Sequence, residues 1–117
     1  MLAKSYSWVL PFIVIGMVVV IAAVPAQAQV QRLVWEHAGG TIRDQGGGNW
    51  VEANPQGVTS YRWREVDRNA EFIEIYDGVR GYTGRLYNNA FYIKGGNENV
   101  GAHFDNFTKF YDGRWSQ

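Results

Sequence analysis

The stretch Glu71 to Lys94, EFIEIYDGVRGYTGRLYNNAFYIK, decides the fold, because its hydrophobic pattern and its turn residues indicate the same structure. Two pairs in it, Asp77-Gly78 and Asn88-Asn89, tolerate the positive φ that a type I′ turn requires. β-branched and aromatic residues flank both pairs, as they do in hairpins. We therefore predict three antiparallel strands joined by two turns of two residues each.

Counting outward from each turn predicts which residues lie opposite one another and which share a face. The predicted opposite pairs are Tyr76 with Val79, Ile73 with Tyr82, Leu86 with Phe91, and Arg85 with Tyr92. One face is apolar and suits a core, with Ile73, Ile75, Tyr82, Leu86, Phe91 and Ile93. The other face is polar but rich in aromatic rings, with Phe72, Glu74, Tyr76, Thr83, Arg85, Tyr87, Tyr92 and Lys94.

The remaining chain adds further strands and no helix. Alternating apolar and polar residues predict strands at 30–37 and 58–66, and shorter ones near 41–43 and 50–52. Aromatic residues after position 103 predict an irregular closing strand. We expect an all-β fold: a small antiparallel meander of about six to eight strands, forming a barrel or a sandwich. Closure would remove the exposed strand edges that promote aggregation.

The N-terminus has the layout of a secretory signal peptide. Lys4 precedes an apolar run from Trp8 to Ala23, and the small-residue pattern Ala26-Gln27-Ala28 follows. The run is sixteen residues long, short of the ~20 that span a bilayer core. We therefore predict cleavage after residue 28, one domain over 29–117, and a secreted or periplasmic location. An uncleaved membrane anchor is the alternative.

Charge and cysteine content exclude several classes of partner and site. Without Lys4, ten lysines and arginines stand against eleven acidic residues, a net charge of −1. This balance argues against binding to nucleic acid or to an anionic membrane surface. The absence of cysteine excludes disulfides and Cys-rich zinc sites. Fifteen aromatic residues after position 28 supply the large side chains that a small core needs.

Short motifs recur along the chain. An aromatic residue is followed two positions later by glutamate at Trp50-Val51-Glu52, Trp63-Arg64-Glu65 and Phe72-Ile73-Glu74, and Tyr-Asp-Gly occurs at Tyr76-Asp77-Gly78 and Tyr111-Asp112-Gly113. The segments GGNWVE, YRWREVDRN, FIEIYDGVRGYTGRLY and YDGRW occur in this order between Gly48 and Trp115. This order resembles small secreted bacterial domains with the pattern G-x-W-x-E, F-x-E-x-x-R, Y-D-x-x-R and a terminal G-x-W. The resemblance implies an exported bacterial β domain and assigns no catalytic residue.

The residues needed for catalysis are sparse. A cysteine nucleophile is excluded, and Ser60 lies within a predicted strand rather than on a nucleophile elbow. Three glutamates could supply a carboxylate pair for glycoside hydrolysis: Glu52, Glu65 and Glu74. Ion pairs with the arginines of neighbouring strands, namely Arg62, Arg64, Arg80 and Arg85, are the simpler role for them. Oxygen ligands of the kind calcium prefers occur at Asn97, Glu98, Asn99 and Asp105, but their spacing matches no calcium loop. We predict no catalytic residue, no metal and no cofactor.

The aromatic-rich outer face of the double hairpin suggests a binding function. Aromatic rings stack on the apolar faces of sugars, and polar side chains at their edges supply hydrogen bonds. The candidate ligand-binding residues are Tyr76, Arg85, Tyr87, Tyr92 and Glu74. Gly81, expected opposite Glu74, would leave a gap for a ring. We predict a non-enzymatic binding module for a saccharide or envelope component. The alternative is a structural or protein-interaction domain of the envelope, or a self-associating one, with no small-molecule ligand.

Overall fold

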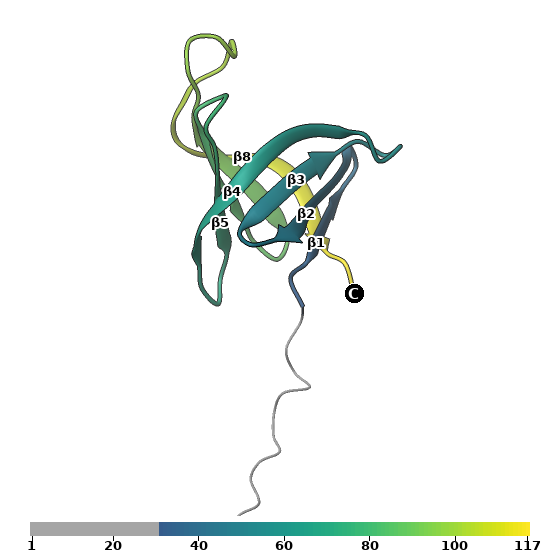
Figure 1. Ribbon diagram of the computed structural model, residues 1–117. Helices are drawn as coiled ribbons and strands as arrows, with labels where there is room; N and C mark the ends of the chain where they lie inside the picture. Colours follow the sequence, from purple (N-terminus) through teal and green to yellow (C-terminus); the bar gives the residue numbers. More distant parts are fainter. Residues whose placement is uncertain (1–30) are drawn as a thin grey trace, which may run out of the picture. The chain divides into compact units, whose positions relative to one another are not determined.

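A computed structural model describes residues 31–117 (Figure 1). The predicted signal peptide, 1–28, lies outside the described residues. Within 31–117, no helix is long and apolar enough to cross a membrane.

The described chain forms eight antiparallel strands closed into a barrel. The strands are β1 (Val34–His37), β2 (Gly40–Gly46), β3 (Asn49–Ala53), β4 (Thr59–Arg68), β5 (Ile73–Asp77), β6 (Tyr82–Leu86), β7 (Ala90–Gly95) and β8 (Phe104–Trp115). Each strand pairs with the next in sequence, and β1 pairs with β8 to close the ring. Figure 1 shows these two strands side by side at the closure. The predicted all-β meander is confirmed, and it closes as a barrel.

The second predicted turn is confirmed. The Tyr87 N–H donates to the Ala90 carbonyl oxygen at 2.9 Å, which closes a turn of two residues, Asn88 and Asn89. The opposite pairs at this turn are the predicted ones, Leu86 with Phe91 and Arg85 with Tyr92.

The first predicted turn is wrong, because the β5–β6 loop has four residues, 78–81, instead of two. The observed opposite pairs are Ile73 with Leu86, Glu74 with Arg85, Tyr76 with Thr83, and Asp77 with Tyr82. The shift relative to the prediction is four residues, an even number. Side chains alternate between faces with a period of two, so every residue stays on its predicted face.

Asp77 explains the longer loop, because its side chain organises the turn from the last position of β5. Its Oδ1 accepts the backbone N–H groups of Val79 at 2.9 Å and Arg80 at 3.1 Å. The Gly81 N–H donates to the Asp77 carbonyl oxygen at 2.8 Å. Gly81, with φ of 77°, and not Gly78, supplies the left-handed conformation.

Large side chains fill the interior of the barrel. All six residues predicted for the core face are buried: Ile73, Ile75, Tyr82, Leu86, Phe91 and Ile93. Other strands add Trp35, Ile42, Trp50, Trp63 and Trp115 to the same cluster. A Cβ on Gly84 would lie 2.5 Å from the Phe91 ring, so this position leaves no room for a larger residue. The core is therefore packed by side chains, as in other small eight-stranded barrels.

Candidate functional site

Two copies of the Trp-x-Glu motif face each other inside the barrel. Trp50 of β3 lies opposite Trp63 of β4. The Trp63 Nε1–H donates to Glu52 Oε1 at 3.2 Å, and the Trp50 Nε1–H donates to Glu65 Oε1 at 3.0 Å. Each indole therefore binds the glutamate of the other copy. In the third copy, Ile73 points inward, so Phe72 and Glu74 point outward.

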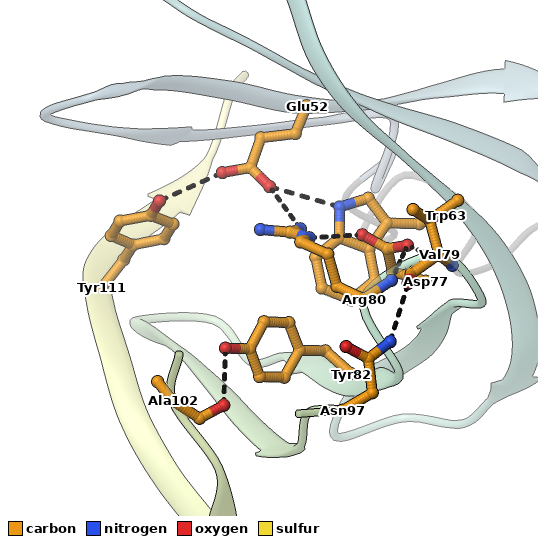
Figure 2. Close-up of polar contacts among 9 residues, drawn as sticks. All are labelled: Glu52, Trp63, Asp77, Val79, Arg80, Tyr82, Asn97, Ala102 and Tyr111. Atoms are coloured by element: carbon orange, nitrogen blue, oxygen red, sulfur yellow. Dashed lines mark hydrogen bonds and ion pairs between the residues drawn. The ribbon is translucent and has the colours of Figure 1, made fainter. Parts of the chain in front are cut away.

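Glu52 lies at the centre of a buried polar cluster at one end of the barrel (Figure 2). It is 6% exposed, and its Oε2 accepts the Tyr111 hydroxyl at 3.0 Å. Arg80 lies between two carboxylates, with Nη2 at 3.8 Å from Glu52 Oε1 and Nε at 2.6 Å from Asp77 Oδ2. The Arg80 guanidinium also lies over the Tyr61 ring, 3.3 Å from its centroid. The loop after β5 thus places a cation over the acidic end of the core.

Burial and hydrogen bonding shift the pKa values in this cluster. Burial raises the pKa of Glu52, and the hydrogen bonds from Tyr111 and Trp63 partly offset that effect. Burial and the Glu52 carboxylate together raise the pKa of the Tyr111 hydroxyl. His37 stacks on Tyr111 with ring centroids 3.9 Å apart, and burial lowers its pKa.

The opposite end of the core carries a second ion-pair cluster. Glu65 accepts two hydrogen bonds from Arg68, both at 3.0 Å, and Arg68 also lies 3.8 Å from Asp44. The hydrogen bond from Arg68 lowers the pKa of Glu65. The prediction that the glutamates pair with arginines is confirmed for Glu52 with Arg80 and for Glu74 with Arg85. For Glu65 the partner is Arg68, three residues along its own strand.

The space beside the Glu52 cluster is too small for a ligand. Glu52, Trp63, Arg80, Tyr82 and Phe91 line part of a cavity of about 10 Å³. A cavity of this size holds one water molecule at most. Among residues 31–117, no group of three or more His, Asp or Glu residues is arranged to hold a metal ion. The Glu52 cluster therefore has no room beside it for an organic ligand.

The outer surface of β5–β8 carries a connected group of rings around one arginine. We call it the outer aromatic face and define it as Phe72, Arg85, Tyr87, Tyr92 and Phe107. The Arg85 guanidinium carbon lies between two rings, 4.4 Å from the centroid of Phe72 and 4.1 Å from that of Phe107. Ring centroids are 5.3 Å apart between Phe72 and Tyr87 and 5.5 Å apart between Tyr87 and Tyr92. All five residues are half-buried.

The structure brings together four of the five candidate ligand residues. Arg85, Tyr87 and Tyr92 belong to the outer aromatic face, and Glu74 is joined to it by an ion pair of 2.8 Å between its Oε1 and Arg85 Nε. Tyr76 lies apart from these rings, opposite Arg64 and Thr83, and it is 37% exposed.

Two details of the predicted face differ in the structure. Gly81 does not lie opposite Glu74, because Arg85 occupies that position. The expected gap is therefore filled by a guanidinium. Sequence reasoning also missed Phe107, whose place beside Arg85 depends on the pairing of β7 with β8. That pairing carries two bulges, at Phe91/Tyr92 and Ile93/Gly95, which no local pattern reveals.

Neither the protein-family models nor the curated proteins match this chain, and no solved structure matches its fold.

Proposed function

We propose that this chain is an exported binding module without catalytic activity, and that its outer aromatic face binds a saccharide of the cell envelope or its surroundings. The observation that carries the proposal is the connected set of half-buried rings across β5–β8. Sugar rings have apolar C–H faces that pack on aromatic rings, and their hydroxyl groups need polar partners nearby. Glu74 and Lys94 supply such partners at the edge of this face.

The rings of this face are held in place before any ligand arrives. Arg85 is fixed by its ion pair with Glu74 and by the rings of Phe72 and Phe107. Tyr87 in turn contacts Phe72 and Tyr92. Side chains that are already ordered lose little conformational entropy on binding, so more of the contact energy contributes to affinity.

Truncating one ring at a time tests the proposal. Tyr87→Ala and Tyr92→Ala should weaken binding of neutral oligosaccharides of glucose or N-acetylglucosamine at least about tenfold, since each removes stacking surface. Isothermal titration calorimetry is the suitable measurement. The four described tryptophans are buried, so their fluorescence reports the core rather than this face.

Phe110→Ala is the matched control, because Phe110 is an aromatic residue of β8 that is 48% exposed and lies outside the outer aromatic face. It should leave affinity unchanged. Thermal unfolding should show a loss of ~1–2 kcal/mol for the tyrosine variants, the scale of a half-buried ring. A loss of ~3–5 kcal/mol with no saccharide bound would instead support the alternative, a structural domain whose rings only support the barrel.

A further inference from the structure

Between residues 40 and 66, the charged residues of β2, β3 and β4 are sorted by face. The acidic residues between 40 and 66 are Asp44, Glu52 and Glu65, and the basic ones are Arg43, Arg62 and Arg64. Glu52 and Glu65 bind indoles inside the barrel, and Asp44 shares the inner face because it lies opposite Trp50. The three arginines occupy the alternate positions, face outward and are exposed. The outer surface of this part of the sheet is therefore basic, and the acidic Asp67 follows only beyond the bulge of β4, opposite Glu74.

Two of these arginines lie in one row across the sheet. Arg43 of β2 and Arg62 of β4 both lie opposite Val51 of β3, one on each side. Neighbouring strands are about 4.8 Å apart, so the two arginine backbones are roughly 10 Å apart. Val51 is only 7% exposed. The two side chains thus stand on either side of an apolar floor.

The arginines border a groove on the outer surface. It has a volume of about 400 Å³, and Thr41, Val51, Ala53 and Thr59 line it together with the two arginines. This volume lies in the range of ~300–1,000 Å³ that is typical of sites for small organic ligands. We call it the arginine groove and define it as Thr41, Arg43, Val51, Ala53, Thr59 and Arg62.

The arginines of this groove lack carboxylate partners among the described residues. In residues 31–117, ion pairs within 4.0 Å engage four other arginines, Arg68, Arg80, Arg85 and Arg114. Arg32, which precedes β1, donates to the Asn69 carbonyl oxygen at 2.8 Å. No such ion pair involves Arg43, Arg62 or Arg64. Glu36, the outward carboxylate of neighbouring β1, is paired with Arg114 at 3.4 Å. Two guanidinium groups therefore remain available for an external anion.

We infer that the arginine groove binds a saccharide that carries a carboxylate, with the carboxylate held between Arg43 and Arg62. A guanidinium matches a carboxylate with two parallel hydrogen bonds, which favours this anion over a neutral group. The threonine hydroxyls suit the remaining sugar hydroxyls. Arg64, the next outward residue of β4, lies opposite Tyr76, which offers an exposed ring.

The saccharide part of this inference rests on the proposed function, but the anion site depends on different residues. The test titrates the protein with a galacturonic acid trimer and with the same trimer after full methyl esterification. The acid should bind, and its affinity should fall at high salt because exposed charge pairs are screened. The ester, which has no charge, should lose most of the affinity.

Substitution then locates the site. Arg43→Gln and Arg62→Gln should each weaken binding of the acid about tenfold, and Arg114→Gln, with the same change in net charge, should have no effect. Arg62→Lys should bind with intermediate affinity, because it keeps the charge and loses the paired hydrogen bonds. Thermal unfolding checks that all four variants remain folded.

Three outcomes would overturn the inference: no binding of the acid, equal binding of acid and ester, or equal loss in all three glutamine variants. Inorganic sulfate that binds as tightly as the trimer would overturn the saccharide assignment. If the outer aromatic face does not bind saccharides, this would appear separately, because Tyr92→Ala would then bind neutral oligosaccharides as tightly as the unmodified protein.

Discussion

Glu52 and Glu65 occupy the same position in two copies of one motif, but their surroundings differ. Glu52 is almost fully buried, and burial raises its pKa above the ordinary value of 4.5. Glu65 is more exposed and receives two hydrogen bonds from Arg68, which lower its pKa below that value. The two carboxylates should therefore affect stability in opposite directions as the pH changes.

For Glu52, acidification from neutral pH toward 4.5 should increase the free energy of unfolding. The native state takes up the proton before the unfolded state does in this window. For Glu65, stability should decrease as the pH falls below 4.5, because the unfolded state takes up its proton first. Chemical denaturation of Glu52→Gln and Glu65→Gln across pH 3 to 7, relative to the unmodified protein, would measure both contributions. If the contributions of Glu52 and Glu65 to the free energy of unfolding changed with pH in the same direction, the opposite pKa shifts would be contradicted.

Two glycines at the ends of one loop should respond differently to substitution. Gly81 has φ of 77°, and a Cβ there would lie 3.3 Å from the Asn97 backbone nitrogen. Gly81→Ala should therefore cost ~1–2 kcal/mol of stability. Gly78 has no positive φ, and a Cβ there would make an ordinary contact with Tyr76. Gly78→Ala should be neutral within ~0.5 kcal/mol. Equal melting temperatures for the two variants would contradict the four-residue loop.

At the scale of the strands, the two hairpins show what local sequence can predict. Asn88-Asn89 has no competing turn, and its predicted register is confirmed. Asp77-Gly78 suits a two-residue turn as well as Asn88-Asn89 does. The Asp77 carboxylate, however, can also accept hydrogen bonds from the backbone amides of a longer loop. The assignment of side chains to the two faces stays correct despite that error, because the register shifts by an even number of residues. The buried face was therefore predictable, and the residues lying opposite one another at the first turn were not.

The same limit applies to the candidate sites. Tyr87, Tyr92 and Arg85 were predictable as one face because they belong to one hairpin. Phe107 joins them through β8, and its place is set by bulges in the pairing with β7. The arginine groove depends on three strands in register, with Arg43 and Arg62 on either side of Val51. Contacts of this kind follow from the closure of the barrel and not from any single stretch of sequence.

At the scale of the whole described chain, residues 31–117 form a closed ring of strands whose first and last members are neighbours. Trp35 of β1 lies opposite Trp115 of β8, and the Ser116 N–H donates to the Val34 carbonyl oxygen at 2.7 Å. A circular permutant of 31–117 that joins Gln117 to Gln31 through a short glycine-rich linker, and opens the chain between Asn88 and Asn89, should keep the barrel. Its new ends lie in an exposed turn, where cuts are tolerated best.

The permutant should retain the strand content in far-ultraviolet circular dichroism and a single cooperative unfolding transition. A second permutant, opened between Glu74 and Ile75 inside β5, is the control, because it breaks the ladders to β4 and β6. It should be much less stable. If the first permutant lost as much stability as the control, the closure of β1 on β8 would be contradicted.

The closure of β1 on β8 also determines how the barrel would be presented when tethered. β1 starts, and β8 ends, at the end of the barrel opposite Glu52, where Figure 1 shows the C-terminus beside the start of β1. A fusion partner, a surface linker or a pulling handle attached at residue 31 or at residue 117 would leave from that one end. Attachment at either site would orient the molecule in the same way, with the Arg80 loop farthest from the support. Force applied between the two sites would pull β1 from β8 in a zipper-like geometry, one hydrogen bond at a time.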